Sequence, residues 1–456
     1  MIITNLLYIL QAENYEIKRF LKFSYTHLRW WDLSKRKGID WTKKARLIHA
    51  LSFAGLSTII FVLIWNLGIY GAIYSLLLLP IIPLIIALAL IFIYPLDRHL
   101  KKIIIRKAKN LIDSLKGKLI VIGITGSYGK TSTKEILASI LREKYRVAFT
   151  TGNINTDIGV ADFILKNKSL ISGSEIFVVE MGAYRQDEIR KICDIVRPEY
   201  SITTGINESH LEKFGKLMTT IETKFELAEA TEKDSILNIN DVNIRSNYDK
   251  FKIRNPITSL PEVREVKELE KLQGLEFKIG ESLFRTKLLA RHNIDLIQLC
   301  SALALKLGLN IGNMVSGVRK VEYIKHRLEP IYNSSSDIWV IDDSYNGNLE
   351  GFKSGLEVLN RALGRKIVLT PGLVEQGEKE REIHEKIGEM YLVNKIDLVL
   401  LIKNKASDYI ANVFQKNNFT NYKIYNSTIE AHNDLGNILK SGDTIIFQND
   451  WPDNYF

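Results

Sequence analysis

A stretch of 50 consecutive residues, 47–96, contains no Asp, Glu, Lys or Arg and consists mainly of Leu, Ile, Ala, Phe and Val. A helix that crosses a membrane needs about 20 apolar residues, so the stretch is long enough for two such helices and a tight turn. The Asn-Leu-Gly run at 66–68 is typical of that turn and divides the stretch into predicted spans at 47–66 and 70–94. The sequence therefore predicts an N-terminal transmembrane helical hairpin.

Two prolines, Pro80 and Pro83, fall in the second predicted span, where they would kink a helix without ending it. The pattern argues against a cleaved signal peptide, because the apolar segment is too long and begins too far into the chain. The alternative interpretation is an apolar hairpin buried in the core of a large soluble protein.

Positive charge is concentrated on both sides of this stretch. Residues 29–46 contain seven basic and two acidic side chains, and residues 97–118 contain eight basic and two acidic ones. The whole chain has a net charge of +10, so the rest of it is close to neutral. This placement argues against nucleic acid as the partner and favours membrane lipids. Because both flanks are basic, we expect a location at the inner (plasma) membrane with the rest of the chain, residues 97–456, in the cytoplasm.

The length of 456 residues is sufficient for two or three domains, and only two cysteines are present, which excludes a disulfide scaffold. The expected fold class is α/β behind the transmembrane hairpin. The predicted parts are a cytoplasmic or interfacial segment at 1–46, the hairpin at 47–96, a basic linker at 97–117, a central P-loop α/β domain at 118–325 and a C-terminal Rossmann-like α/β domain at 326–456.

The clearest chemical motif follows a short apolar run at 119–124, which is typical of a parallel strand buried on both faces. The next residues, TGSYGKTS at 125–132, lead into a predicted helix at 133–143. In a P-loop, backbone N–H groups at the helix N-terminus hold phosphate, the lysine (Lys130) contacts the terminal phosphates and the hydroxyl of Thr131 reaches Mg²⁺. The usual first glycine is replaced by Ile124, so a chance glycine-rich turn is the alternative interpretation.

Polar residues also follow two later apolar runs, with Glu180 after 176–179 and His210 shortly after 200–204. Ligands collect at the carboxyl ends of parallel strands, so both side chains are candidate ligands of a divalent metal at the phosphate site. Taken singly, each side chain has the alternative role of a helix cap or a surface residue.

Further motifs give residues 118–455 a specific resemblance to the Mur ligase family, closest to the branch that adds D-alanyl-D-alanine to a muramoyl tripeptide. These motifs are GITGSYGKTSTK at 123–134, TGNIN at 151–155, EMGA at 180–183, HLEKFG at 210–215, TKFE at 223–226, RHN at 291–293, HRLE at 326–329 and DDSYN at 342–346.

The resemblance implies an ATP-dependent carboxylate–amine ligase that uses two Mg²⁺ ions and a carbamylated lysine, Lys224. The implied catalytic residues are Lys130, Lys224 and His210, and the implied metal ligands are Thr131, Glu180 and His210. The implied nucleotide-binding residues are Gly126, Ser127, Tyr128, Gly129, Lys130, Thr131, Ser132, Asn293, Arg327 and Asp343. The implied substrate-binding residues are Asn153, Asn155, Tyr345 and Asn346. An unmodified lysine on a helix surface is the alternative for Lys224.

Several positions depart from the family pattern. Leu296 stands where a second asparagine is usual, and the segments 346–349 and 370–375 differ from the usual turns that help to select the amine. Only residues 97–118 separate the hairpin from the P-loop strand, which leaves no room for the family's uridine-binding first domain. We therefore expect the hairpin to bring the enzyme to a substrate presented at the membrane.

The first hypothesis is a ligase of cell-wall peptide synthesis that joins a peptidoglycan precursor to an amino acid or dipeptide. The alternatives are a related ligase for another amide polymer, such as a polyglutamate, and a membrane-anchored ATP-binding scaffold without ligation. The sequence leaves open the identity of both substrates, whether the precursor is UDP-linked or lipid-linked, the oligomeric state and the role of residues 1–28.

Overall fold

The computed structural model describes residues 2–13, 15–26, 30, 38–207, 216–345, 347–373 and 376–449. The chain forms two compact units, with the boundary between Ile103 and Ile104. The first unit is helical, and the second contains three β-sheets with their flanking helices.

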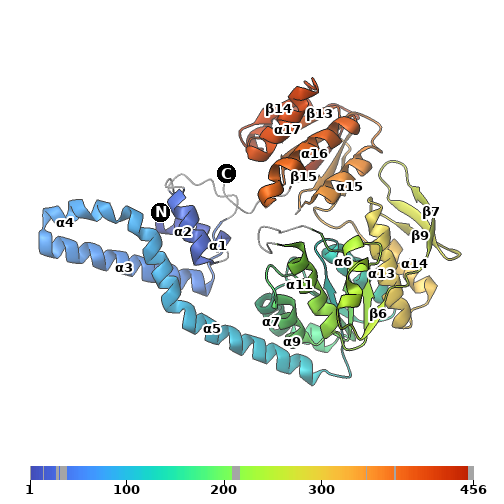
Figure 1. Cartoon of the computed structure of the whole chain (residues 1–456), viewed down its shortest axis with the longest axis horizontal. Helices are drawn as coiled ribbons and strands as arrows, with labels where there is room; N and C mark the ends of the chain where they lie inside the picture. The colour runs from blue at the N-terminus through green and yellow to red at the C-terminus, as the bar shows by residue number, and fades with distance from the viewer. Residues whose placement is uncertain are drawn as a thin grey trace. The chain divides into compact units, whose positions relative to one another are not determined.

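The first unit is built around an apolar hairpin (Figure 1). Its elements are α1 (Ile2–Ala12), α2 (Ile17–Thr26), α3 (Lys43–Leu67), α4 (Ile69–Tyr74), a 3-10 helix (Ser75–Ile81) and the beginning of α5 (Ile82–Ser114). The helices α3 and α5 run antiparallel, as two contacts between them show: Lys44 forms an ion pair with Asp97 (2.9 Å), and Gly55 faces Ile85. The apolar helix α1 is buried against α3 and the first turns of α5.

The second half of the hairpin differs from the single span that the sequence predicts. Residues 69–81 form a short α-helix and a 3-10 helix before α5 begins, and the 3-10 helix contains Pro80, which has no N–H group to donate within a regular helix. The predicted linker at 97–117 is helical as far as Ser114 and continues α5 without a break. By length and composition alone, Lys43–Leu67 and Leu77–Ser114 are each sufficient to cross a membrane.

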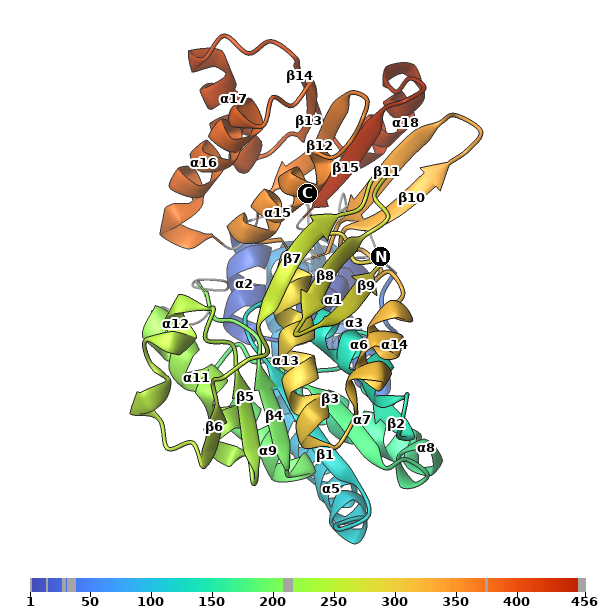
Figure 2. The same cartoon turned by 90° about the vertical axis from the view of Figure 1, so that its right-hand side faces the viewer.

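In the second unit, the central sheet has six parallel strands in the order β2-β3-β1-β4-β5-β6 (Figure 2). The strands are β1 (Ile120–Thr125), β2 (Val147–Phe149), β3 (Ile176–Glu180), β4 (Tyr200–Thr203), β5 (Asp234–Leu237) and β6 (Asn255–Ile257). Its helices are α6 (Lys130–Leu141), α7 (Asp157–Lys166), α8 (Lys168–Ser172), α9 (Glu188–Val196), α11 (Leu217–Ala230), α12 (Val242–Arg245), α13 (His292–Lys306) and α14 (Ile311–Arg319).

Two apolar layers cover this sheet. Side chains of α6, α13 and α14 pack on one face, and side chains of α7, α9 and the last turns of α5 pack on the other. The same domain also contains an antiparallel sheet of β7 (Val263–Glu268), β8 (Leu275–Ile279) and β9 (Ser282–Thr286). Its apolar side chains join the same core as α13 and α14.

The C-terminal sheet has the order β10-β11-β15-β12-β13-β14, and only the β10–β11 pair is antiparallel. Its strands are β10 (Glu329–Asn333), β11 (Ile338–Asp343), β12 (Lys366–Gly372), β13 (Leu398–Ile402), β14 (Tyr422–Tyr425) and β15 (Thr444–Asn449). Helices α15 (Leu349–Leu359), α16 (Glu380–Val393) and α17 (Lys405–Lys416) pack on one face, and α18 (Thr428–Ile438) packs on the other. This arrangement is the Rossmann-like α/β layer that the sequence predicts.

Candidate functional site

The glycine-rich loop connects β1 to α6 at the carboxyl end of the central sheet. Gly126 has a φ of 153° and Gly129 a φ of 76°, backbone conformations that favour glycine. A Cβ atom at Gly126 would lie 2.1 Å from the hydroxyl of Thr204, so the loop also needs glycine for space. The helix begins at Lys130, three residues earlier than expected, and its N-cap residue Gly129 supplies no side-chain capping bond. Its first N–H groups therefore suit phosphate.

The absence of the first P-loop glycine has a simple cause. Ile124 lies inside β1, where it is fully buried and pairs with Glu180 of β3 on one side and Ile202 of β4 on the other. A buried central strand gains stability from a β-branched residue at this position. The loop begins after this residue, so the replacement leaves the phosphate-binding part intact.

The side chain of Tyr128, one of the implied nucleotide-binding residues, contacts other parts of the same domain. Its hydroxyl donates a hydrogen bond to Asp241 (2.8 Å), and its ring lies against Gly205, where a Cβ atom would be 2.2 Å from the ring. Asp241 also accepts a hydrogen bond from the N–H of Ile206 (3.0 Å). The side chain therefore fixes the loop to the ends of β4 and β5. Asp241 is a site residue that motif comparison alone does not single out.

The two described metal-ligand candidates lie together. Glu180 ends β3 and is 2% exposed, and its Oε2 accepts a hydrogen bond from the hydroxyl of Thr131 (3.1 Å). The third candidate, His210, lies outside the described residues. A hydroxyl and a carboxylate are hard oxygen donors of the kind that Mg²⁺ prefers, so this pair fits the ion.

Glu180 has two further partners that the motifs do not predict. The ammonium of Lys134 lies 3.0 Å from Oε2, and the amide of Asn155 lies 3.4 Å from Oε1. Asn155 thereby connects the loop at 151–155 to the metal-ligand pair, whereas Asn153 of the same loop is exposed. Ser132, on the first turn of α6, is buried.

Three cationic side chains influence one another electrostatically at this site. Burial lowers the pKa of Lys130, and the charge of Arg327 lowers it further, against the opposing effect of Glu180. Burial and the charge of Lys130 lower the pKa of Lys224 on α11 to about 7. A cluster of positive charge beside the phosphate loop is suited to an anionic ligand with several phosphates.

The C-terminal domain contributes Arg327, Asp343 and Tyr345. The guanidinium of Arg327 lies 4.7 Å from the centre of the Tyr345 ring. Asp343 ends β11, and burial raises its pKa to about 7 although Arg327 opposes this effect. Asn346 lies outside the described residues.

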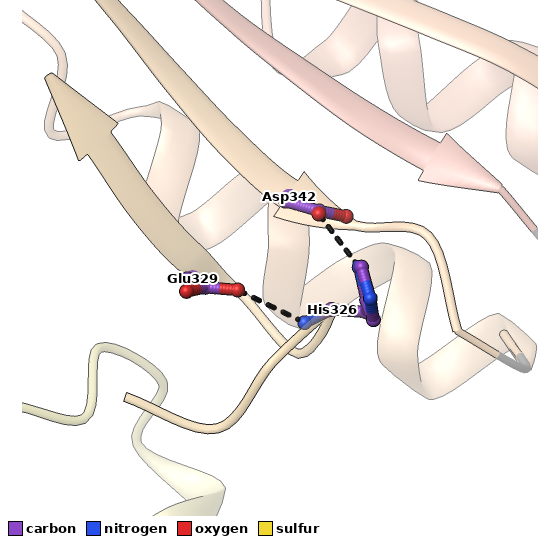
Figure 3. Close-up of side chains that lie close together, drawn as sticks. All are labelled: His326, Glu329 and Asp342. Carbon is purple, nitrogen blue, oxygen red and sulfur yellow. Dashed lines mark hydrogen bonds and ion pairs between the residues drawn. The ribbon is translucent and has the colours of Figure 1, made fainter. Parts of the chain in front are cut away.

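The turn that carries Arg327 is held by its neighbours (Figure 3). The His326 ring nitrogen Nδ1 lies 2.8 Å from Asp342 Oδ2, and Glu329 accepts the His326 N–H (3.2 Å). His326 and Leu328 both have left-handed backbone conformations, with φ of 61° and 50°. These contacts offset the strain of the turn and fix the backbone on both sides of Arg327.

Asn293, one of the implied nucleotide-binding residues, is buried in the first turn of α13. One turn later, Leu296 stands in place of the usual asparagine and contacts the phosphate loop, since a Cβ atom at Gly129 would be 3.1 Å from its Cδ2. The departure noted in the sequence thus gives an apolar contact that packs α13 against the loop.

Comparison with known proteins agrees with this geometry. The Mur ligase middle domain matches residues 124–304, and the Mur ligase, glutamate ligase domain matches residues 326–448. UDP-N-acetylmuramoyl-tripeptide–D-alanyl-D-alanine ligase of Haemophilus influenzae is 28% identical over 297 residues, covering 63% of this chain and 64% of that enzyme. The enzyme of the same name from Borreliella burgdorferi is 30% identical over 330 residues, covering 69% of this chain and 68% of that enzyme.

Among solved structures, the MurF ligase of Thermotoga maritima in complex with ADP superposes with a TM-score of 0.63 at 25% identity. The match covers 76% of this chain and 80% of that chain. The resemblance deduced from the motifs is confirmed, and the chain belongs to the Mur ligase family.

Proposed function

We propose that the protein is an ATP-dependent ligase that joins a carboxylate to an amine in the synthesis of a peptidoglycan precursor. One observation carries this proposal. Three features lie together at the carboxyl end of the central sheet: a glycine-rich phosphate loop, the Thr131–Glu180 pair and the buried amine of Lys224.

The chemistry explains why these groups are needed together. A free carboxylate resists attack by an amine, so the γ-phosphoryl group of ATP is first transferred to a carboxylate oxygen and ADP leaves. The amine then attacks the acyl carbon, phosphate leaves with the carbon–oxygen bond electrons, and the amine loses a proton as the amide forms. Bound Mg²⁺ supplies charge neutralisation for the phosphates, and Thr131, Glu180 and His210 are the residues that would hold it.

The chain's own side chains have distinct tasks in this reaction. Lys130 and Arg327 bind phosphate oxygens, and Asp343 binds ribose hydroxyls. Asn153, Asn155, Tyr345 and Asn346 orient the substrates. A carbamylated Lys224 is an anion, which would bind a second metal ion instead of repelling it.

The substrates proposed from the relatives are a muramoyl tripeptide and D-alanyl-D-alanine, because both named relatives are ligases for this pair. The chain spans 64% of the length of the Haemophilus relative, and its sequence at 370–375 departs from the family pattern. A ligase for another amide polymer is therefore the second candidate.

Purified full-length protein tests the proposal through ADP release. We expect release only when ATP, a muramoyl peptide and an amine are all present, and a product whose mass identifies the new amide. UDP-linked and lipid-linked peptides should be compared, each with D-alanyl-D-alanine and with single amino acids. Nucleotide binding without ADP release on any substrate pair would favour the scaffold alternative.

We further propose that the hairpin inserts into the membrane and that the catalytic domains face the cytoplasm. Residues 61–77 form the tip of the hairpin. Large apolar side chains there are exposed, including Phe61 (63%), Trp65 (78%) and Leu77 (67%). Polar side chains in this region donate hydrogen bonds to their own helix: Thr58 to Ala54 O and Asn66 to Val62 O. Such internal pairing is what lipid surroundings require.

Charged substitutions at the tip test the membrane proposal. The variant with Phe61→Asp and Trp65→Asp should lose co-flotation with liposomes, because an aspartate opposes insertion of the tip, at a cost that reaches about 2.5–3.5 kcal/mol at a bilayer centre and is smaller near the interface. Leu363→Asp is the matched control, since this leucine is 90% exposed in the C-terminal domain. Undiminished flotation of the tip variant would contradict insertion. If the hairpin also presents a membrane-bound substrate, turnover of a lipid-linked acceptor should fall more than turnover of a soluble one, whereas an equal fall leaves only a tether.

A further inference from the structure

Lys134 is a fully buried lysine beside the metal-ligand pair. It lies one turn after Lys130 on α6, and its side chain is 0% exposed. Its ammonium donates to Glu180 Oε2 (3.0 Å) and to the backbone carbonyl of Gly152 (3.1 Å). Gly152 belongs to the loop at 151–155, which also contains Asn155. One cation therefore connects the phosphate-loop helix, the metal-ligand carboxylate and the loop expected to bind substrate.

A buried charged lysine at this position lowers the stability of the fold, so its presence suggests that the charge has a function. Removing an ammonium from water is unfavourable even when a carboxylate pairs with it, and an apolar side chain of similar size would often be at least as stable. Most neighbours on the buried side of α6, such as Ile136, Leu137 and Ile140, are apolar. The charge is therefore better explained by its effect on Glu180 than by its contribution to packing.

The effect on Glu180 follows from electrostatics. Thr131 and Lys134 both donate to the same oxygen, Oε2, and only Lys134 carries a charge. A divalent ion that approaches this carboxylate is repelled by the ammonium, whose field is weakly screened in a buried site. The phosphates of a bound nucleotide would offset this repulsion, because they add negative charge next to the same carboxylate.

We propose that Lys134 is a positioning residue that serves as an internal counter-cation of Glu180. It holds the carboxylate and the 151–155 loop in place, and it makes divalent-metal binding depend on the nucleotide. The inference rests on the proposed function in one respect, namely that Glu180 is a metal ligand.

Titration of the full-length protein with Mn²⁺ alone, followed by electron paramagnetic resonance, tests this inference without turnover. Without nucleotide, Lys134→Met should bind Mn²⁺ at least about tenfold more tightly than the wild type, because the repelling charge is gone. With a non-hydrolysable ATP analogue present, the two proteins should differ much less. Lys134→Arg keeps the charge and should retain weak binding without nucleotide.

Two further variants separate the proposed effect from a general loss of structure. Lys134→Gln is uncharged but retains an amide donor for Gly152, so it should show the same gain if the methionine variant folds poorly. Adding Glu180→Gln to Lys134→Met should abolish the gain, which places the bound ion at Glu180. Folded Lys134 variants that bind Mn²⁺ no more tightly than the wild type would overturn the inference.

The outcome is distinguishable from failure of the proposed function. A wild-type protein that shows nucleotide-dependent Mn²⁺ binding but forms no amide contradicts the ligase proposal and leaves the role of Lys134 standing. A working ligase in which Lys134→Met leaves metal binding unchanged contradicts the role of Lys134 alone.

Discussion

Replacing Lys130 with alanine is expected to abolish ATP turnover while the protein remains folded. Lys130 begins α6, and its ammonium lies 2.7 Å from the carbonyl of Gly126, within the phosphate loop. It belongs to a loop and a helix end, so its loss leaves no cavity in the apolar core. Its charge is expected to act on phosphate oxygens, and losing a contact of this kind typically slows a reaction by roughly 10²–10³-fold.

Coupled detection of ADP gives the rate, and the thermal midpoint reports the fold. Lys191→Ala is the matched control, because Lys191 is an exposed lysine on α9 of the same domain and should retain wild-type turnover. A Lys130→Ala protein that keeps more than about a tenth of the wild-type rate would show that Lys130 is not the phosphate-binding lysine.

Several central strands could be predicted from the sequence because parallel strands buried on both faces are short continuous apolar runs. The runs at 119–124, 176–179 and 200–204 correspond to β1, β3 and β4. The loop between β1 and α6 was equally predictable, since its residue types are dictated by backbone geometry and phosphate chemistry.

Contacts between distant residues could not be predicted in this way. Tyr128 looks like any residue of a phosphate loop, and only the fold brings Asp241 to its hydroxyl. Lys134 looks like a solvent-facing lysine on a helix, and only the end of β3 supplies its partner Glu180. In each case the decisive interaction depends on strand order, which local patterns do not encode.

For the apolar hairpin at 47–96, the ends of the helices are what the sequence does not predict. Its apolar composition is unmistakable, but composition does not define where the helices end. The 3-10 helix at Ser75–Ile81 and the continuation of α5 to Ser114 depend on proline geometry and on packing against the central domain. Ala108 and Ile112 belong to that domain's core, which explains why the second half of the basic linker is helical.

We predict that Lys224 carries a carbamate and that replacing this lysine causes a second large loss of activity. Carbamate formation joins the neutral amine to CO₂ and releases one proton, so it requires an uncharged lysine. Burial and the neighbouring charge of Lys130 lower the pKa of Lys224 to about 7, so about half of the amine is neutral at pH 7. The neutral fraction rises with pH and falls below pH 7. Activity lost at pH 6 should therefore be partly restored by added bicarbonate.

Lys224→Ala should reduce amide formation by at least about 100-fold, because the variant lacks the anion that offsets the charge of a second metal ion. A small carboxylate such as acetate should restore part of the activity, since it supplies a negative charge in the space that the side chain leaves. The modification itself can be observed by carbon-13 NMR of protein equilibrated with labelled bicarbonate. A carbamate signal should be present in the wild type and absent from Lys224→Ala.

Lys233→Ala is the control for this assignment, because Lys233 pairs with Glu199, and this hydrogen bond raises the pKa of its amine. Its ammonium stays protonated at neutral pH and cannot react with CO₂, so removing it should leave the carbamate signal unchanged. An active, metal-bound wild-type protein without the signal would mean that Lys224 acts as an unmodified lysine. Its positive charge would then contact phosphate directly, and acetate would give Lys224→Ala no rescue.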